Sequence, residues 1–436
     1  MRNLKLRSAV VALLLCVTPC FVEAQFLMDM IDTTKDIGRG MLGVFKKYDH
    51  LTIGGYMQPQ FQYASDTGIN SYSGGNFPAS SNNRFMFRRG RVRFDYARFT
   101  KDDYPFVQFA FQFDGTERGV NIRDFWGRVW DTKWHLFALT TGMFARPFGY
   151  EINLSSGDRE APERGRMSQI LLRTERDMGA MLSFEPQEKS NRFHQVKLDA
   201  GFFNGQGLTG PNDYDRYKDF IGQIRWKPSQ ISHNLFLSGG VSILNGGIRQ
   251  PGSYRYVSVK TASGNYQMMK DSSHATGSKM PRKYQGINAQ LRWKNRWGAT
   301  ELRGEYWQGT QTATLASSET PPTLVNGENL YKRSFNGVFV TFLQNIVNDK
   351  NQLLIKYDMY DPNTEVKGID IGQTGSNLSA ADIKFETLGT GFLRHINENL
   401  KVILFYEFVA NEKTELPKYT ADVKDNVFTC RLQFRF

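Results

Sequence analysis

Three arginines at alternate positions, Arg89, Arg91 and Arg93, are the residues whose spacing most clearly suggests a chemistry. On a β-strand, side chains two residues apart share a face and lie about 7 Å apart along it. Guanidinium groups stay charged at neutral pH, and their forked donors match the oxygens of phosphate and carboxylate groups. A row of them in a water-filled pore is expected to concentrate anions and pass them stepwise. The alternative is pairing with acidic side chains on neighbouring strands, which is common in barrel interiors.

A second group of basic residues lies in and beside a long connection at about 148–176. Its members are Arg146, Arg159, Arg164, Arg166, Arg173 and Arg176, and the same stretch carries Asp158, Glu160, Glu163, Glu175 and Asp177. In a barrel, a connection of this length either covers the outside or dips into the lumen and narrows it. We therefore expect a constriction at which these arginines line an ion pathway. A solvated, self-paired loop is the alternative, because acids nearly balance bases.

The elements that must position these side chains are expected to be β-strands in lipid. In the last ten residues, one face carries Phe428, Cys430, Leu432, Phe434 and Phe436, and the other carries Thr429, Arg431, Gln433 and Arg435. Strict period-two alternation of apolar and polar residues is typical of a strand with lipid on one side and water on the other. Residues 106–114, 284–294 and 401–409 follow the same pattern.

The connections between strand-like segments alternate in length from residue 51 onward. Short ones lie near 100–104, 131–134, 186–192, 228–233, 295–298, 345–350 and 395–399. Long ones lie near 65–84, 148–176, 204–215, 245–283, 310–330, 361–380 and 411–424, and 115–120 is the short member of that set. This predicts an all-β fold: a transmembrane antiparallel β-barrel of about 16 strands with short periplasmic turns and long external loops. A soluble β-sandwich is the alternative, but its outer face would be polar.

The start of the chain has the features of a secretion signal. A basic start, an apolar stretch and a small-residue site ending at Ala24 predict a cleaved signal peptide over 1–24. We expect 25–50 to be a periplasmic N-terminal segment and 51–436 to be the barrel, located in the bacterial outer membrane. Cys430 is then the one remaining cysteine, so no internal disulfide can form.

The bulk composition is compatible with a barrel and argues against transmembrane helices. The mean hydropathy is −0.48, although 14% of the residues are aromatic. A barrel strand turns only alternate residues toward lipid, so its average hydropathy stays low. The net charge of +12 does not by itself decide function.

Four ordered blocks resemble the phosphate-selective porin O and P family. They are Gly54-Gly55-Tyr56-Met57-Gln58 followed by Arg88-Arg89-Gly90-Arg91-Val92, then Gly142-Met143-Phe144-Ala145-Arg146-Pro147-Phe148-Gly149-Tyr150-Glu151, Arg176-Asp177-Met178-Gly179-Ala180, and Gly201-Phe202-Phe203-Asn204-Gly205. The resemblance implies a homotrimeric outer-membrane channel with an in-folded third loop. It also implies an arginine ladder selecting phosphate or polyphosphate, to which Arg89, Arg91 and Arg93 correspond by position.

The predicted function is an outer-membrane diffusion porin that passes small hydrophilic solutes and prefers anions such as phosphate. Outer-membrane lipid and lipopolysaccharide are its expected surroundings. The alternatives are a non-selective general porin and an adhesin or receptor acting through its external loops, chiefly 245–283 and 310–330. No enzyme activity is expected, because the histidines are scattered and none belongs to a recognisable Ser/His constellation. No cofactor, metal site or nucleic-acid partner is expected either.

Overall fold

The structure, a computed structural model, describes residues 50–208, 213, 215–322 and 328–436. The predicted signal peptide, 1–24, and the predicted periplasmic segment up to residue 49 lie outside the described residues. The strands are β1 (Leu51–Ala64), β2 (Asn83–Phe99), β3 (Pro105–Thr116), β4 (Gly119–Trp130), β5 (Phe137–Ala145), β6 (Arg176–Phe184), β7 (Val196–Phe203), β8 (Asp219–Ser232), β9 (Leu235–Arg249), β10 (Arg255–Lys260), β11 (Tyr266–Asp271), β12 (Lys279–Asn295), β13 (Gly298–Ala313), β14 (Tyr331–Ile346), β15 (Asn348–Asp361), β16 (Phe385–His395), β17 (Leu400–Asn411) and β18 (Val427–Arg435). Helix α3 spans Arg166–Leu171, and turns of 3-10 helix lie at Glu151–Asn153, Gly368–Asp370 and Ala380–Asp382.

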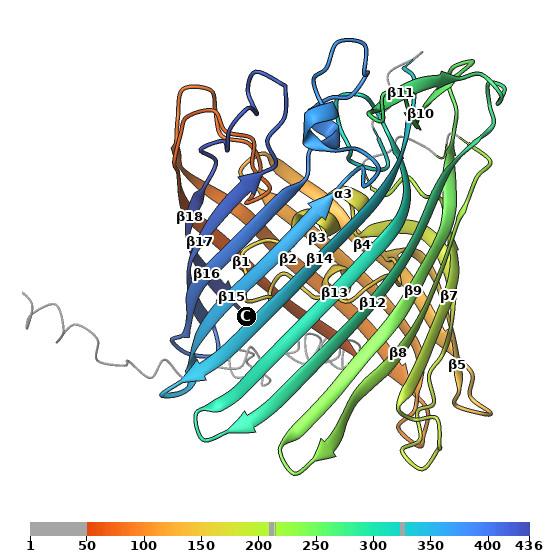
Figure 1. Ribbon diagram of the computed structural model, residues 1–436. Helices are drawn as coiled ribbons and strands as arrows, with labels where there is room; N and C mark the ends of the chain where they lie inside the picture. The colour runs from red at the N-terminus through yellow and green to blue at the C-terminus, as the bar shows by residue number, and fades with distance from the viewer. Residues whose placement is uncertain (1–49, 209–212, 214, 323–327) are drawn as a thin grey trace, which may run out of the picture. The chain divides into compact units, whose positions relative to one another are not determined.

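Sixteen of these strands form one closed antiparallel barrel, as predicted (Figure 1). Strands β2 to β9 pair one after another in chain order. β9 then pairs with β12, and the series continues from β12 to β18. β1 pairs with β2 and with β18, where Met57 faces Phe434 and Tyr63 faces Phe428. Closure leaves no free sheet edge in the ring, which is what a barrel in lipid requires.

The strands alternate between a polar inner face and an apolar outer face. In β18, Thr429, Arg431 and Gln433 are buried toward the lumen, whereas Leu432 and Phe434 are exposed on the outside. This is the assignment predicted from the sequence. Among the described residues, no helix is long and apolar enough to cross a membrane.

The short turns gather at one end of the barrel and the long connections at the other (Figure 1). Two of the predicted turns are too long. β8 continues through Pro228 to Ser232, with register shifts after Trp226, because a proline without an N–H cannot keep the ladder but can sit at a bulge. β14 and β15 are joined through Val347 alone, which has φ of 67°.

At the loop end, several long connections pack on one another. The β10–β11 hairpin is not part of the ring, and β10 pairs in parallel with the start of β14 through Tyr256 and Tyr331. Met268 of the hairpin is buried in an apolar cluster with Tyr331, Ile371 and Ile383. The sequence pattern predicts one connection over 245–283 and does not indicate this hairpin.

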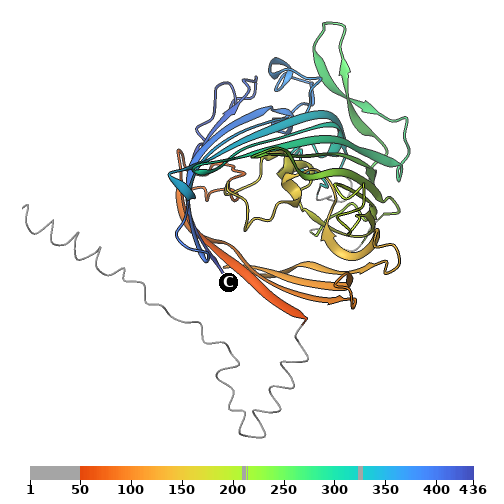
Figure 2. The same cartoon turned by 90° about the horizontal axis from the view of Figure 1, so that it is seen from below.

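The connection between β5 and β6, residues 146–175, lies inside the barrel. Viewed along the barrel, this yellow loop with helix α3 crosses the interior of the ring (Figure 2). Its apolar side chains, including Phe148, Ile152 and Met167, are buried against Trp307 and other wall residues. The loop is therefore a packed part of the interior that narrows the lumen.

Candidate functional site

The in-folded loop begins at Gly149, where the chain turns away from the wall. Gly149 has φ of +65°, and a Cβ atom there would overlap the carboxylate of Glu305 on β13. The Gly149 N–H donates to the Ser242 hydroxyl at 3.0 Å. The N–H groups of Tyr150 and Glu151 donate to Glu305 at 2.8 and 2.9 Å. These bonds fix the root of the loop against β9 and β13.

Farther along the loop, Glu163 is the centre of an ion-pair cluster. Its carboxylate accepts from Arg88 at 2.9 Å and Arg89 at 2.7 Å on β2, and from Arg431 at 2.8 Å on β18. Burial raises the pKa of the Glu163 carboxyl, but the three guanidinium groups outweigh it and hold that pKa well below its usual range. Glu163 therefore anchors the loop to β2 and β18 as a carboxylate.

A second cluster joins β4 to the end of the loop. Arg123 donates to Glu175 at 2.5 Å, and Arg164 lies 3.3 Å from the same carboxylate. Arg176, at the start of β6, donates to Asp124 at 2.8 Å. Burial raises the pKa of the Glu175 carboxyl, but the adjacent guanidinium groups lower it well below its usual range.

The other predicted arginines of β2 continue this cluster toward the short turns. Arg91 donates to Asp114 at 3.1 Å, and Arg93 donates to Asp95 at 2.5 Å. We call these side chains together the arginine network. Its described members are eight arginines, Arg88, Arg89, Arg91, Arg93, Arg123, Arg164, Arg176 and Arg431, with five carboxylates, Asp95, Asp114, Asp124, Glu163 and Glu175.

The opposite side of the loop is held by separate contacts to β13, β15 and β17. Glu160 accepts from Arg303 at 2.8 Å, and Glu151 pairs with Lys356. The Lys401 ammonium donates to the Gly157 carbonyl at 3.0 Å. Because the loop is tied to strands all around the ring, its position in the lumen is fixed by charge and hydrogen bonding.

Three predicted arginines lie apart from the network. Arg146 is fully buried at the root of the loop, where it donates to the Thr174 carbonyl. Arg173 lies 3.3 Å from Glu319 in the connection between β13 and β14. Arg166, treated below, is the third. Arg159 is buried close to Glu163 and Arg89, but within the described parts of the chain it has no ion pair.

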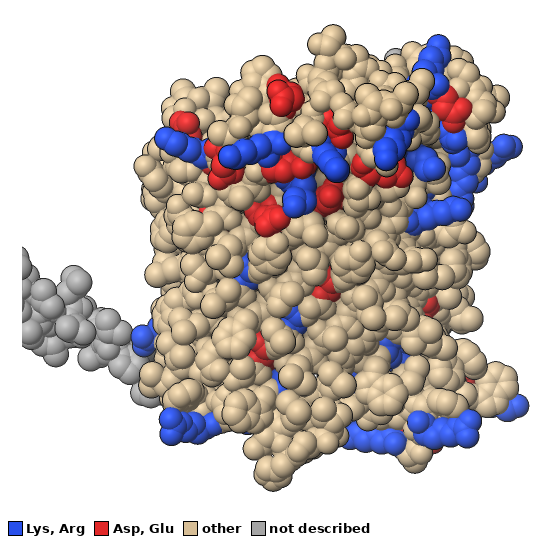
Figure 3. Space-filling model, viewed as in Figure 1, with Lys and Arg blue, Asp and Glu red and all other residues tan. Residues whose placement is uncertain are grey.

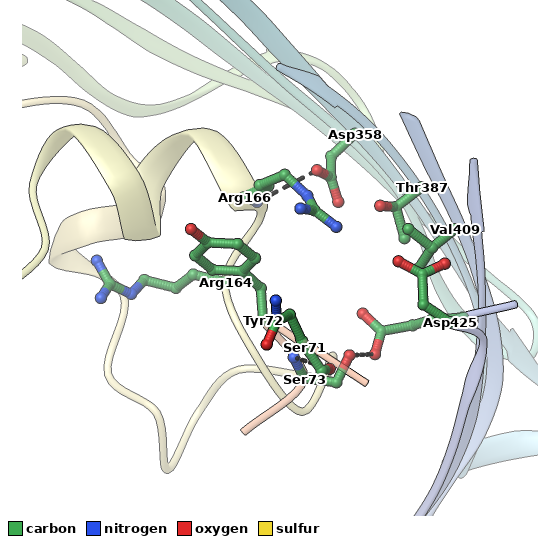
Figure 4. A pocket seen from close by; sticks show the side chains of 11 residues that line it. Ser71, Tyr72, Ser73, Arg164, Arg166, Asp358, Thr387, Val409 and Asp425 are labelled. Atoms are coloured by element: carbon green, nitrogen blue, oxygen red, sulfur yellow. Dashed lines mark hydrogen bonds between the residues drawn. The ribbon is translucent and has the colours of Figure 1, made fainter. Parts of the chain in front are cut away.

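Arg166, at the start of α3, points toward the wall on the side of β15 to β17 (Figure 4). Its guanidinium lies 4.7 Å from the ring centre of Tyr72 and 3.9 Å from that of Phe385. A cavity of about 20 Å³ here is lined by Asp358, Glu407 and Asp425 as well, enough for a single water molecule. Burial raises the pKa of Asp425, in the connection after β17, to about 6. This corner is too small to be a solute route.

Two larger cavities lie beside the in-folded loop toward the short turns. One, of about 330 Å³, is lined by Lys197, Arg225 and Lys227 with Glu185, and we call these four residues the basic bay. In it, Lys197 and Lys227 lie 2.7 and 3.1 Å from Glu185. The other cavity, of about 300 Å³, has a mixed lining that includes Asp158, Glu160, Arg292 and Lys401. Of these two cavities, only the one that contains the basic bay is lined mainly by cations.

Sequence reasoning missed Arg88, Arg123 and Tyr72 as parts of the lumen. Alternation places Arg88 on the face opposite Arg89, yet both donate to Glu163. Tyr72 belongs to the β1–β2 connection, and its carbonyl accepts from Gln169 of the in-folded loop at 2.9 Å. The inward folding of two loops brings Arg88 and Tyr72 to the loop, and a register shift between β3 and β4 leaves Arg123 unpaired in the ladder, 3.5 Å from Asp114. No local pattern signals either feature.

Comparison with solved structures agrees with this architecture, whereas comparison of the sequence finds no relative. No protein-family model matches the sequence, and no curated protein matches it. Three solved structures have similar folds over most of both chains. They are OprB of Pseudomonas putida (TM-score 0.58, 9% identity, 92% of this chain and 98% of that one), the outer-membrane channel DcaP of Acinetobacter baumannii (0.52, 14%, 88% and 97%) and an anion-selective porin from Comamonas acidovorans (0.50, 11%, 88% and 99%).

The chain has the porin fold. Because the sequence identities are only 9 to 14%, the similarity to these structures shows the fold alone. The solute must be argued from the residues of this chain. The described residues contain no cluster of three or more His, Cys, Asp or Glu arranged to hold a metal ion.

Proposed function

We propose that this chain is an outer-membrane diffusion porin for small hydrophilic solutes, with its short turns in the periplasm and its long loops outside. The closed ring with an apolar outer face and a polar lumen supports the location. The clamped loop at 146–175 supports a narrowed, water-filled passage rather than a packed interior.

We further propose that the passage prefers anions, and the arginine network is the observation that carries this proposal. Eight guanidinium groups face five carboxylates among the described members, so ion pairing reduces the positive charge without cancelling it. The basic bay continues the excess toward the short turns: Lys197 and Lys227 share Glu185, and Arg225 donates to Asp199 at 2.9 Å, so three cations meet two carboxylates. Anions passing on this side of the loop would meet positive potential first at the arginine network and then at the basic bay.

The proposed ion pathway includes Arg89, Arg91, Arg93, Arg159, Arg164 and Arg176. Arg159, buried beside the network without an ion pair in the described residues, is the member with the most spare hydrogen-bonding capacity. Phosphate is the anion that we propose the pathway favours, because forked guanidinium donors match its oxygens. Arg146, Arg166 and Arg173 have structural partners and are proposed to position the loop.

The test is the reversal potential of the refolded mature protein in a planar bilayer under a KCl gradient. We expect a potential on the anion side. The triple change Lys197→Gln, Arg225→Gln and Lys227→Gln should move it toward zero, because it neutralises the basic bay. The matched control is Arg249→Gln, Lys279→Gln and Lys283→Gln, which removes the same charge from the outer face of β9 and β12.

Other results would change the proposal in defined ways. A potential near zero for the unmodified protein would indicate a general porin and end the anion proposal. If added phosphate lowers the chloride current, this would support a row of phosphate-binding sites in the pore. If added phosphate has no effect, the pore would select anions by charge without binding phosphate specifically. Folded protein without any conductance would favour the receptor alternative.

We also propose that the chain assembles as a homotrimer through the outer face of β2 to β4. This wall carries outward aromatic side chains in mutual contact, with ring centres of Phe111 and Phe125 at 5.0 Å and of Phe111 and Phe113 at 4.5 Å. The outer face of β12 to β15 exposes aliphatic side chains such as Ile287, Val340 and Ile355, with the aromatics Trp293, Tyr306, Phe342 and Tyr357 set singly among them. Large rigid aromatics are enriched where protein surfaces meet.

A further inference from the structure

Three basic side chains stand on the outside of the barrel at its loop end. Arg249 of β9 and Lys279 of β12 are register partners across the two strands, and both are exposed. Lys283 lies on the same outward face of β12, about 14 Å farther along the strand. We call Arg249, Lys279 and Lys283 the outer basic patch. Figure 3 shows Lys and Arg gathered over this part of the loop end.

These three cations lack the partners that the inward cations have. Arg282, between the two lysines on β12, is fully buried and donates to Asp219 at 2.9 Å. Within the described ranges, Arg249, Lys279 and Lys283 form no ion pair. Arg282 and Lys283, adjacent on β12, therefore place a neutralised cation inside and a cation without an ion pair outside. Beside Arg249, the Asp215 carboxylate accepts from the Arg249 backbone N–H at 2.9 Å, so the patch has three cations and one nearby acid. The charge of the patch is available to a ligand that approaches from outside the barrel.

The patch lies directly beside the apolar outer belt. Ile287, four residues beyond Lys283 on the same face of β12 and nearer the short turns, is 56% exposed, and Ile243 on β9 is 50% exposed. In Figure 3 the surface below the charged zone is nearly free of charged side chains. A lipid whose chains cover Ile243 and Ile287 would hold its headgroup at the height of the patch. Ammonium and guanidinium groups at that height select an anionic headgroup, and phosphate is the anion that both bind most readily.

We propose that the outer basic patch binds the phosphate groups of lipopolysaccharide in the outer leaflet. This inference rests on the proposed outer-membrane location and orientation but not on what the pore conducts. The nearby ring of Tyr217, 6.0 Å from the Lys279 ammonium, gives the sugar part of such a headgroup a flat surface to contact. The site lies outside the lumen, so binding there and ion selection inside are separable.

The experiment is a titration of the purified mature protein, in non-ionic detergent, with lipopolysaccharide and with the same lipid after removal of its phosphates. Binding is followed by native mass spectrometry and by the temperature at which the barrel unfolds. We expect the intact lipid to bind and to raise that temperature, and the dephosphorylated lipid to bind far less. In Arg249→Gln with Lys279→Gln and Lys283→Gln, affinity for the intact lipid should fall roughly a hundredfold, since each basic group near an anionic surface contributes about fivefold.

The basic-bay triple, Lys197→Gln with Arg225→Gln and Lys227→Gln, is the matched control and should bind lipopolysaccharide like the unmodified protein. Equal binding by the patch triple, or equal binding of the dephosphorylated lipid, would overturn the proposal. Inorganic phosphate that stabilises the protein as much as the lipid does would also overturn it, in favour of a free-phosphate site. Should the triple fail to refold, Lys283→Gln alone must still weaken binding. The conductance of the patch triple in a bilayer without lipopolysaccharide should be unchanged. A failure of the lipopolysaccharide proposal can therefore be distinguished from a failure of the porin proposal.

Discussion

Glu163 shows how one carboxylate can set the position of a whole loop. It accepts from Arg88, Arg89 and Arg431, which lie on two strands from opposite ends of the chain. Its pKa is lowered well below the ordinary value, so the stability that it contributes is fully present above the pKa of the unfolded chain. That stability is lost only as the pH falls through the lower folded value. Mild acidification should therefore leave the loop in place.

The change Glu163→Gln should loosen the loop and leave three guanidinium groups without their shared partner. Removing one member of a buried ion pair costs about 3–5 kcal/mol, so the denaturant midpoint of the barrel should fall. The lost negative charge should also shift the reversal potential further to the anion side and increase open-channel noise. Urea titration and planar-bilayer recording measure these effects. Glu365→Gln, at an exposed position outside the lumen, should change neither.

At this scale the sequence predicts residue types and faces better than partners. Alternation alone is enough to place Arg89, Arg91 and Arg93 on one face of β2, and the arrangement with acids was one of two alternatives. Arg91 and Arg93 pair with Asp114 and Asp95 on wall strands, whereas the partner of Arg89 depends on the path of residues 146–175. Glu163 lies 74 residues from Arg89, and no local pattern encodes that contact.

Among the elements, the in-folded loop depends on its first turn. Gly149 adopts a left-handed conformation against Glu305 and Trp307, where any Cβ atom would collide. The bonds from this turn to Ser242 and Glu305 then aim the loop across the lumen. A change at this one position should therefore move the constriction while leaving the barrel strands paired.

The change Gly149→Ala should displace the root of the loop and widen the pore. The left-handed backbone alone costs a non-glycine residue about 1–2 kcal/mol, and the overlap with Glu305 adds to it. Gly75→Ala is the matched control, because Gly75 has φ of +104° with no atom within 4 Å of its Cβ position. Single-channel conductance should rise for Gly149→Ala and stay unchanged for Gly75→Ala. Equal conductance of both variants would show that the turn does not set the constriction.

The ring strands were predictable where a period-two pattern and a turn signal coincide, as in β3, β12, β17 and β18, and less clearly in β14 and β16, whose sequences fit either face. Two features of the fold could not be predicted from the sequence, each for a physical reason. Pro228 normally ends a strand, but here a bulge absorbs it and β8 runs on. The β10–β11 hairpin gains its stability from an apolar cluster with Ile371 and Ile383, more than a hundred residues away along the chain. Loop-to-loop packing of this kind leaves no periodic signature.

For the molecule as a whole, the two sides of the barrel differ in what they show to their surroundings. Aromatic rings in mutual contact cover the outside of β2 to β4, whereas β12 to β15 expose aliphatic side chains with single aromatics such as Trp293 and Phe342 among them, and β9 with β12 carries the outer basic patch. A barrel surrounded by lipid on all sides would gain nothing from this difference. The asymmetry is what we expect if one wall meets other subunits and another meets lipid.

The trimer proposal can be tested with two phenylalanines that both face outward, Phe125 on β4 and Phe342 on β14, which are 60% and 38% exposed in the single chain. If both side chains face lipid, truncation to alanine should lower the stability of the barrel by similar amounts at the two positions. At a subunit interface, loss of a central aromatic costs 2 kcal/mol or more, which weakens association about thirtyfold. Phe125→Ala should therefore dissociate on dilution in detergent, as measured by light scattering after size-exclusion chromatography, while Phe342→Ala should keep the mass of the unmodified protein. If Phe342→Ala dissociates instead, the subunits meet on the other wall, and the outer basic patch would then lie close to that interface rather than facing open lipid.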